Sequence, residues 1–181
     1  MIEIENLDIK DIKLIKTKRY DDSRGFFQQN YHLKDYSDLG IKNNFVQDNW
    51  SFSHKGVLRG LHYQEKNSQA KLVQVIKGSI FDVAVDLRKK SPTFGNWVGM
   101  TLSDKNGYQL FIPRGFAHGF LSLKDNTVVY YKCDNFYDSN DQKGIRWDDS
   151  ELNIKWPQVD KLITSEKDKK LHLLKDILRN L

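Results

Sequence analysis

The apolar residues of the chain come in short bursts between positions 45 and 137. The bursts are rich in valine, isoleucine and aromatic residues, and turn signals separate them at Lys77-Gly78, at Ser91-Pro92 and at 104–107. Short strands at this spacing favour an antiparallel sandwich or barrel over alternating strands and helices. The pattern therefore predicts a mainly β fold, with strands in the segments 71–87, 96–103, 108–113 and 127–133.

Two segments outside this region follow a helical pattern. Residues 32–40 predict a short N-terminal helix, with Leu33, Tyr36 and Leu39 on one face and Gly40 as its stop. Near the C-terminus, leucines recur at helical spacing after Ser165, which is a suitable N-cap. We expect an amphipathic helix over about residues 166–181, with an apolar face formed by Leu171, Leu174, Leu178 and Leu181.

Composition limits the class of protein more than it identifies it. The chain has 181 residues, of which 39% are hydrophobic and 29% charged, as is ordinary for a soluble globular protein. Without a linker or a repeat, residues 1–181 are expected to form one domain, with a barrel core at about 45–137. No apolar run is long enough for a transmembrane helix, and the acidic, alternating N-terminus does not resemble a signal peptide.

Charge and cysteine content point to a cytoplasmic protein. The single cysteine, Cys133, cannot form a disulfide within the chain and fits a reducing compartment. The net charge of +5 comes from basic residues that are interleaved with acidic ones. This pattern predicts a solvated surface rather than a nucleic-acid footprint. We therefore expect neither a nucleic-acid partner nor a membrane partner.

Two segments carry polar groups where a core strand would carry valines. Residues 56–64 (GVLRGLHYQ) place Arg59, a fixed cation, near His62, a group that exchanges protons near neutral pH. Residues 107–120 place a second histidine, His118, in a similar apolar setting. On a regular strand Arg59 and His62 would face opposite sides, so we expect a bulge at Gly60 to bring both to one side. Together the two segments predict a pocket that binds an anion and transfers protons.

The spacing of the second segment has a wider resemblance. Between residues 107 and 118 it reads G-x5-P-x-G-x2-H, which resembles the second sequence motif of the cupin superfamily of small jelly-roll barrels. The first cupin motif normally supplies two histidines to a metal site, whereas this chain has His62 followed by Gln64 at that place. One imidazole from each segment, His62 and His118, is too few for a stable transition-metal site. We therefore expect the barrel without the metal.

Nine segments, in order along the chain, narrow the resemblance. They are DSRGFF at 22–27, FVQDN at 45–49, VLRGLHYQ at 57–64, QAKLVQV at 69–75, FDVAVDLRKKSPTFG at 81–95, FIPRGFAHGF at 111–120, YKC at 131–133, WDD at 147–149 and SEKD at 165–168. All resemble the dTDP-4-dehydrorhamnose 3,5-epimerase family, from about residue 11 to about residue 170. The resemblance implies a cupin-type jelly-roll homodimer that uses no cofactor. The resemblance also implies that the enzyme inverts C3 and C5 of dTDP-4-dehydro-6-deoxy-D-glucose to give dTDP-4-dehydro-L-rhamnose, in dTDP-L-rhamnose biosynthesis.

The implied chemistry is proton transfer next to a ketone. The C4 carbonyl acidifies the hydrogens on C3 and C5, so inversion needs a base on one face, an acid on the other, and stabilisation of the enolate oxygen. The resemblance makes His62 the base and Tyr131 the acid, with Asp168 as the partner of His62. However, Ser165-x-x-Asp168 is also close to a helix capping box, so a purely capping Asp168 stays an alternative.

The other implied site residues bind the substrate. Lys71 and His118 match residues that line the sugar, with the Lys71 ammonium near the C4 oxygen. Arg24 and Arg59 match arginines that hold the diphosphate, where permanent charge and fork geometry are useful. The implied substrate-binding set is completed by Gln29, Gln47, Asn49, Gln142 and Lys167.

Some positions depart from the family pattern. Gln29 stands where many members carry a glutamate, Gln142 or Lys143 where an acidic residue is common, and Phe136 where tyrosine is frequent. These departures leave open which base and sugar are recognised and whether both carbons are inverted. The alternatives are an epimerase of C3 or C5 alone or a ketoisomerase on a related sugar. A metal-dependent cupin such as a dioxygenase and a non-catalytic sugar-nucleotide binding module are hypotheses from other classes.

Three further expectations concern packing. At least one of Phe26 and Phe27 is expected to lie in the core. Strand alternation places Cys133 on the same face as Tyr131, but a free cysteine is expected to be buried and inert rather than nucleophilic. The alternating run at residues 1–9 is a candidate for strand pairing between two subunits, because an open sheet edge is a liability that dimerisation can remove.

Overall fold

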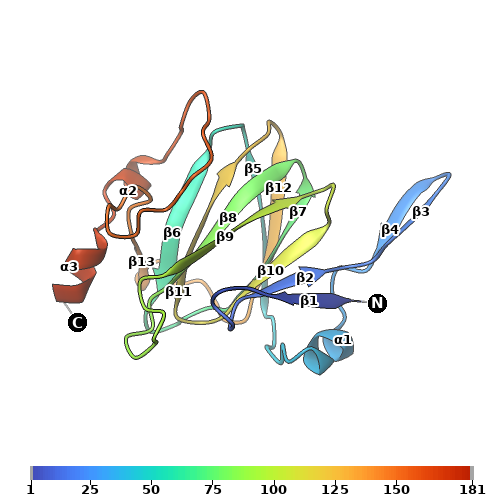
Figure 1. The fold of residues 1–181 in the computed structure, drawn as a ribbon, viewed down its shortest axis with the longest axis horizontal. Helices are drawn as coiled ribbons and strands as arrows, with labels where there is room; N and C mark the ends of the chain where they lie inside the picture. The colour runs from blue at the N-terminus through green and yellow to red at the C-terminus, as the bar shows by residue number, and fades with distance from the viewer. Residues whose placement is uncertain (1, 180–181) are drawn as a thin grey trace.

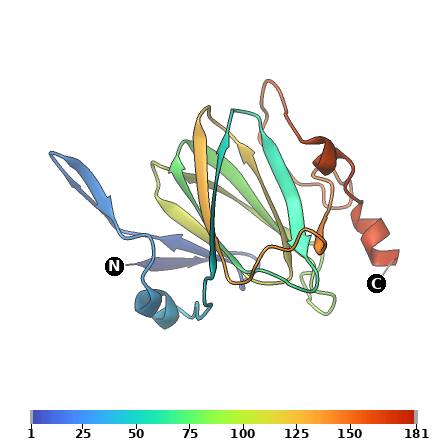
Figure 2. The same ribbon diagram turned by 180° about the vertical axis from the view of Figure 1, so that it is seen from behind.

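Two antiparallel sheets face each other in the computed structural model of the chain, in which residues 2–179 are described (Figures 1 and 2). The six-stranded sheet has the order β1-β2-β10-β7-β12-β5 and the five-stranded sheet the order β13-β6-β11-β8-β9. The strands of the six-stranded sheet are β1 (Glu3–Asn6), β2 (Lys13–Lys16), β5 (Gln47–Ser53), β7 (Lys71–Lys77), β10 (Tyr108–Ile112) and β12 (Thr127–Cys133). Those of the five-stranded sheet are β6 (Leu58–Gln64), β8 (Ser79–Asp86), β9 (Trp97–Ser103), β11 (Phe116–Ser122) and β13 (Gln142–Gly144).

The main core lies between the two sheets. Because side chains alternate along a strand, each sheet turns every second residue toward the other one. In β12, for example, Val129 is fully buried in this core and Tyr131 packs against it. The four predicted strand segments are all confirmed as strands. Buried members of the core come from both sheets and include Leu14, Val73, Ile80, Ala84, Val98, Leu110, Ile112 and Phe120.

The sheets extend beyond the barrel core that we expected at 45–137. The N-terminal strands β1 and β2 join the six-stranded sheet because β2 pairs with β10, and β13 joins the five-stranded sheet by pairing with β6. The run at residues 1–9 thus finds a partner strand within the chain, with Glu3 opposite Lys16. Its outer side is the free edge of the sheet.

A two-stranded hairpin projects from the barrel on the side opposite the C-terminal helices (Figures 1 and 2). It consists of β3 (Arg19–Asp22) and β4 (Gly25–Gln28). The expectation that Phe26 or Phe27 lies in the core is wrong, since these side chains are 59% and 69% exposed. The reason is that no other strand or helix of the described chain covers the hairpin, so its aromatic residues face solvent.

The N-terminal helix is present as α1 (Leu33–Asp38). Tyr36 is fully buried and Gly40 ends the helix with a positive φ of 81°, where a glycine is favoured. Leu33 does not lie on the buried face as expected, because it is 59% exposed. With six residues, the helix buries one large side chain rather than an apolar stripe.

The prediction of a single C-terminal helix at 166–181 is wrong. The structure has two short helices, α2 (Glu166–Lys169) and α3 (Leu174–Arg179). Between them the backbone of His172 pairs with Ile145, and its carbonyl accepts a hydrogen bond from the Arg146 N–H at 2.9 Å. This pairing to the barrel replaces the helical hydrogen bonds. Ser165 does cap α2, as expected, and Leu181 lies outside the described residues.

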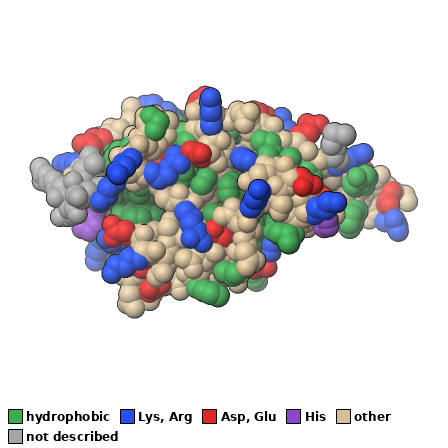
Figure 3. Space-filling view, turned by 90° about the horizontal axis from the view of Figure 1, so that it is seen from below, with side chains coloured by type: hydrophobic (Ala, Val, Ile, Leu, Met, Phe, Trp, Pro, Cys, Tyr) green, Lys and Arg blue, Asp and Glu red, His purple; other side chains and the backbone are tan. Residues whose placement is uncertain are grey.

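Surface charge follows the interleaved pattern of the sequence. Figure 3 shows basic and acidic side chains interspersed over one face of the molecule. Within residues 2–179, no helix is long and apolar enough to cross a membrane.

Candidate active site

A cavity of about 710 Å³ opens between the two sheets. The five-stranded sheet supplies the residues of one wall, the six-stranded sheet those of the other, and α2 with the segment before it closes one side. Its charged and polar lining brings together most of the residues predicted from the sequence. These are Gln47, Asn49, Arg59, His62, Lys71, His118, Tyr131, Gln142, Lys167 and Asp168.

A bulge in β6 turns both Arg59 and His62 into this cavity, as the sequence predicted. Across the β6–β11 pair, His118 lies opposite His62 but Phe120 lies opposite Arg59, so β6 has one extra residue between these positions. The extra residue is accommodated at Gly60, which has a φ of 112°. A Cβ atom there would lie 2.6 Å from the Gly119 Cα, so a residue with a side chain does not fit.

His62 and Asp168 form the first polar pair of the cavity. The His62 Nε2 atom lies 2.7 Å from the Asp168 Oδ1 atom, and the Asp168 Oδ2 atom accepts a hydrogen bond from the Gly60 N–H at 3.3 Å. Burial acts to raise the pKa of Asp168, yet the hydrogen bond from His62 and its positive field bring that pKa below the ordinary value. The carboxylate is therefore ionised and can only accept, so Nε2 carries the proton of the pair and Nδ1 is the basic nitrogen.

The same geometry separates the two hypotheses for Asp168. The cap of α2 is made by the Ser165 hydroxyl, which accepts a hydrogen bond from the Asp168 backbone N–H at 3.0 Å. The Asp168 carboxylate belongs to a residue that is only 4% exposed, and it is directed to His62 and Gly60 instead. Capping and contact with His62 are thus made by different groups.

A second histidine–carboxylate pair lies deeper in the same wall. The His118 Nε2 atom lies 2.7 Å from the Asp82 Oδ1 atom, and both residues are buried. Burial lowers the pKa of His118, so this imidazole is neutral at neutral pH and donates to Asp82. Sequence reasoning missed Asp82. The available signal was an acidic residue in the inward row of a core strand, between Ile80 and Ala84.

Lys71 faces these pairs from the other sheet. Its ammonium group forms no ion pair and no hydrogen bond with another described residue. Burial lowers the pKa of Lys71, while the negative charge of Asp82 acts in the opposite direction. An unpaired cation in a cavity wall is suited to stabilise negative charge on a bound molecule.

Tyr131 and Cys133 lie next to each other on the inner face of β12. Burial raises the pKa of Tyr131, so the phenol keeps its proton, and its hydroxyl has no hydrogen-bond partner among residues 2–179. Burial also raises the pKa of Cys133 to about 11. The thiol is therefore not ionised at neutral pH, which agrees with the expectation of an inert cysteine.

Cations dominate the open part of the cavity. The Arg59 guanidinium is anchored to β5 by hydrogen bonds to the Ser53 hydroxyl at 3.2 Å and to the Phe52 carbonyl at 3.1 Å. Like Lys71, Arg59 and Lys167 form no ion pair with a described carboxylate. The acidic residue of the lining, Asp168, is engaged by His62. The cavity therefore favours a substrate with more than one negative charge.

Tyr137 is a cavity residue that sequence reasoning did not identify. It lies in the loop between β12 and β13, and its hydroxyl donates a hydrogen bond to the Gln142 Oε1 atom at 3.0 Å. Its backbone N–H donates to the Gln47 Oε1 atom at 2.8 Å. A tyrosine in an irregular loop carries no periodic pattern, so the sequence offers little signal for its position.

Two predicted substrate-binding residues do not reach the cavity. Arg24 lies on the projecting hairpin, where it pairs with Asp22 at 2.6 Å, and Gln29 follows the hairpin and donates to Asp35 at 3.0 Å. Neither residue lines the cavity between the sheets. Within one chain, the diphosphate pair predicted from Arg24 and Arg59 is therefore not assembled.

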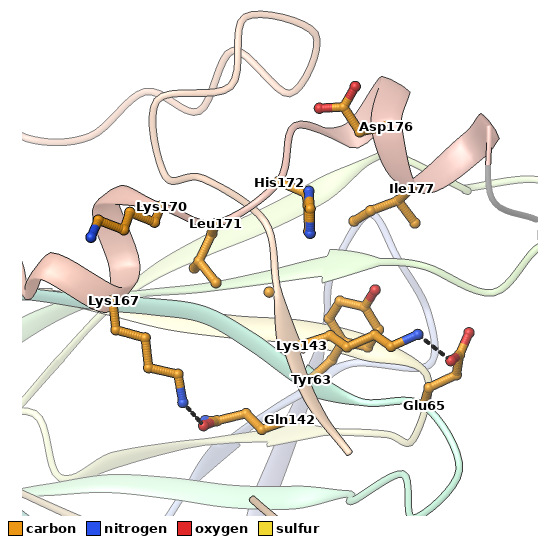
Figure 4. A pocket seen from close by; sticks show the side chains of 11 residues that line it. Tyr63, Glu65, Gln142, Lys143, Lys167, Lys170, Leu171, His172, Asp176 and Ile177 are labelled. Carbon is orange, nitrogen blue, oxygen red and sulfur yellow. Dashed lines mark hydrogen bonds and ion pairs between the residues drawn. The ribbon is translucent and has the colours of Figure 1, made fainter. Parts of the chain in front are cut away.

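A second pocket, of about 440 Å³, adjoins the first (Figure 4). Gln142 and Lys167 line both, and their hydrogen bond is the dashed line at the lower left of the figure. Lys143 and Lys170 line the second pocket but not the cavity between the sheets. The Lys143 ammonium is paired with Glu65.

The donor set for a metal site is poor. Within residues 2–179, no three histidine, cysteine, aspartate or glutamate side chains are grouped so that they could hold a metal ion. His62 and His118 lie on paired positions, but each already contacts its own carboxylate.

A histidine on one sheet, paired with an aspartate of α2, faces a phenol and a lysine on the other sheet, and this arrangement is typical of enzymes that move protons on an anionic substrate. Comparison with known proteins supplies the family. The sequence profile of the dTDP-4-dehydrorhamnose 3,5-epimerases matches residues 6–176. The chain belongs to the dTDP-4-dehydrorhamnose 3,5-epimerase family, and the resemblance inferred from the sequence is confirmed.

Individual relatives agree with this assignment. The dTDP-4-dehydrorhamnose 3,5-epimerase of Methanothermobacter thermautotrophicus is 51% identical over 158 residues, which cover 86% of this chain and 85% of the relative. The crystal structure of the 3,5-epimerase RmlC from Legionella pneumophila, in complex with dTDP-4-keto-L-rhamnose, has a TM-score of 0.95 and 47% identity and covers 97% and 94% of the two chains. These neighbours confirm the cupin-type fold.

A more distant neighbour performs a narrower reaction. The 3′-monoepimerase ChmJ from Streptomyces bikiniensis, in complex with dTDP-quinovose, has a TM-score of 0.91 and 28% identity and covers 97% of this chain and 89% of its own. The same fold thus accommodates single and double epimerases, so the fold alone does not determine how many carbons are inverted.

Proposed function

We propose that the protein inverts both C3 and C5 of dTDP-4-dehydro-6-deoxy-D-glucose and yields dTDP-4-dehydro-L-rhamnose, in the biosynthesis of dTDP-L-rhamnose. The observation that carries the proposal is the placement of His62 and Tyr131. They extend from opposite sheets into one cavity, so a base and an acid flank a sugar held between them. This is the arrangement that inversion of a carbon requires.

The reaction proceeds through an enolate at each carbon. His62 Nδ1 removes the proton from C3 or C5, and the C–H electron pair forms a C=C bond as the C4 carbonyl electrons move to oxygen. The Lys71 ammonium stabilises the resulting negative charge. Tyr131 then donates its proton to the opposite face of the same carbon as the C4=O bond reforms. Proton exchange with solvent restores the His62 imidazole and the Tyr131 phenol, so the net change is one C–H bond broken and one formed on the opposite face of each inverted carbon.

Asp168 and the cations complete the site. The Asp168 carboxylate stabilises the imidazolium that His62 becomes after proton abstraction. Arg59 and Lys167 bind the diphosphate, and Gln47 and Asn49 contact the nucleotide or sugar from β5. His118, held by Asp82, lines the sugar as a neutral hydrogen-bond partner.

We also propose that the working unit is a homodimer. Arg24 and Gln29 lie on a hairpin that projects away from the barrel, so a second copy must bring them to a cavity if they bind substrate (Figure 1). The outer face of the six-stranded sheet also exposes large apolar side chains, among them Trp50, which is 71% exposed, and Phe52 and Ile76. Contiguous apolar surface of this kind is typical of a protein interface.

The protein is expected to act without a metal and in the cytoplasm. The poor donor set around His62, among the residues that the structure describes, supports the first expectation. The single cysteine, Cys133, which cannot form a disulfide within the chain, supports the second. Exhaustive chelation should leave the rate unchanged. If chelation abolished the activity and a divalent ion restored it, the metal-dependent cupin alternative would be correct.

The decisive experiment is incubation with dTDP-4-dehydro-6-deoxy-D-glucose in heavy water. We expect one deuteron at C3 and one at C5 of the product, seen by proton NMR and mass spectrometry. A single deuteron would show an epimerase of C3 or C5 alone, as in the monoepimerase neighbour. A product with altered carbonyl position would show a ketoisomerase. No incorporation would overturn the proposal and favour a non-catalytic binding module.

A further inference from the structure

One amide oxygen at the mouth of the cavity accepts hydrogen bonds from two different walls. The Gln142 Oε1 atom accepts from the Tyr137 hydroxyl, in the loop after β12, and from the Lys167 ammonium, in α2. Gln142 itself is fixed at the start of β13, which pairs with Gln64 of β6. Its side chain thus cross-links two segments that are 30 residues apart in sequence.

The contact continues along the mouth as a chain of hydrogen bonds. The Tyr137 backbone N–H donates to Gln47 at 2.8 Å, and the Gln47 side-chain amide donates to the Asn49 Oδ1 atom at 3.0 Å. We call Lys167, Gln142, Tyr137, Gln47 and Asn49 the rim chain. All five residues line the catalytic cavity, and Gln142 occupies the position that joins the α2 side to the β5 side.

The charge of Lys167 is not neutralised by this arrangement. Of the lysines near it, Lys143 is paired with Glu65 and Lys169 with Glu166, whereas Lys170 forms no ion pair with a described carboxylate but does not line the cavity. Lys167 is held instead by a neutral amide oxygen, and no described carboxylate forms an ion pair with it. A neutral acceptor fixes the position of an ammonium group but leaves its electric field intact, whereas a carboxylate would cancel much of that field.

We infer that Gln142 is a positioning residue, whose uncharged side chain holds Lys167 and Tyr137 at the cavity mouth and so presents an uncompensated cation to the diphosphate of the substrate. This role rests on the proposed function, because it assumes a nucleoside diphosphate in the cavity. Two properties of Gln142 can be tested separately. Its side-chain oxygen holds Lys167 and Tyr137 in place, and its lack of charge leaves the charge of Lys167 uncompensated.

Two substitutions separate these properties. Gln142→Met keeps the size of the side chain but removes the acceptor, so Lys167 keeps its charge and loses its position. Gln142→Glu keeps an acceptor for both donors but adds a negative charge next to Lys167. Binding of dTDP, measured by calorimetry, reports on both variants independently of catalysis. The turnover number and KM for the dTDP-sugar are measured in parallel.

We expect Gln142→Met to weaken dTDP binding about fivefold, since one charged hydrogen bond is no longer pre-formed, with the salt dependence of binding unchanged. Gln142→Glu should weaken it about tenfold or more and also make the salt dependence shallower, because one cation fewer acts on the diphosphate. In both variants KM for the dTDP-sugar should rise by a larger factor than the turnover number falls, because Gln142 acts through Lys167 on the diphosphate rather than on the reacting carbons.

Matched controls come from the pocket of Figure 4. Lys170→Met removes a cation next to the same short helix, but Lys170 does not line the catalytic cavity. This variant should bind dTDP as wild type does. Lys167→Met should weaken binding, and adding Gln142→Glu to it should cause little further loss, since the added charge then has no cation to neutralise.

The inference and the proposed function can fail separately. If wild type binds dTDP and epimerises the sugar but both Gln142 variants bind with wild-type affinity and salt dependence, the inference is overturned. An equal loss of dTDP affinity in Gln142→Glu and Lys170→Met would show that the effect comes from general surface charge. This result would also overturn the inference. If wild type neither binds dTDP nor exchanges deuterium, the proposed function fails, and the inference fails with it.

Discussion

His62 and His118 occupy directly paired positions on β6 and β11, and each imidazole contacts its own carboxylate at 2.7 Å. The two pairs nevertheless differ in exposure, since the side chain of His62 is 26% exposed and that of His118 is 7% exposed. Burial keeps His118 neutral by lowering its pKa. His62 can therefore exchange its proton with a substrate, while His118 is restricted to hydrogen bonding.

The division between base and acid can be tested by hydrogen exchange. His62→Asn should abolish both turnover and incorporation of solvent deuterium into the sugar, because no enolate forms. Tyr131→Phe should suppress net inversion but retain some exchange, because His62 still removes and returns a proton on its own face. Proton NMR of the recovered sugar in heavy water measures both. An equal loss of exchange in the two variants would contradict the assignment.

Asp168→Asn should lower the turnover number at least about a hundredfold, because the asparagine cannot stabilise the imidazolium of His62 or hold its tautomer. In the catalytic triad of the serine proteases the same substitution costs about 10⁴ in rate, which sets the scale. The melting temperature should fall by only a few degrees, since Ser165 still caps α2. Normal turnover with a clearly lowered melting temperature would show that Asp168 serves only the stability of α2.

Asp168→Asn should also change how the unfolding free energy depends on pH in acid. Folding lowers the pKa of Asp168 below its ordinary value of 3.8, so the ionised carboxylate stabilises the native state above about pH 4. This contribution is lost as the pH falls through the lowered pKa. The difference in unfolding free energy between wild type and Asp168→Asn should therefore be constant from about pH 7 to about pH 5 and narrow as the pH falls below about 4, as measured by urea unfolding. A constant difference would argue against an ionised Asp168 in the native state.

Lys71→Met should change activity and stability in opposite directions. Loss of the ammonium removes the group that stabilises the enolate oxygen, and turnover should fall about 10²- to 10³-fold. The melting temperature should rise by about 2 °C or more, because a desolvated cation without a partner is removed from the cavity wall. Lys77→Met, at the exposed end of the same strand, is the control and should change neither. A lower melting temperature for Lys71→Met would mean that the ammonium is structurally paired.

Subunit mixing tests the dimer and the origin of Arg24 together. If the hairpin of one copy serves the cavity of the other, a heterodimer of Arg24→Ala and His62→Asn has one intact site. Mixed after unfolding and refolding, these two weakly active variants should recover about a quarter of wild-type kcat/KM. The mixture of Arg59→Ala with His62→Asn should not recover, since both residues line the same cavity of one chain. If the first mixture recovered no activity, Arg24 would not contribute to the cavity of the partner subunit.

The sequence predicted the features that depend on local patterns. The period-2 bursts located the strands, and a glycine between Arg59 and His62 was sufficient to expect the bulge. The contact of His62 with Asp168 spans 106 residues, and it was expected from resemblance rather than from pattern. Local spacing carries no information on which distant carboxylate approaches a histidine.

Other features could not be predicted because their causes lie outside the segment concerned. The C-terminal leucines have helical spacing, yet tertiary pairing of His172 with Ile145 interrupts the helix. Phe26 and Phe27 have the character of core residues, yet both are mostly exposed, and Phe26 is covered on one face only by the Arg19 guanidinium of its own hairpin. The contacts of Tyr137 depend on the path of an irregular loop, for which periodicity gives no guide.

The bulge at Gly60 has a consequence for how this cavity can evolve. One residue without a side chain allows β11 to approach, turns Arg59 and His62 to the same side, and donates its N–H to Asp168. The separation of Arg59 and His62 is therefore set by the backbone rather than by side chains. A substitution at Gly60 would displace both residues together. New sugar specificities should consequently arise from the facing sheet and from the mouth, where single side chains can change independently.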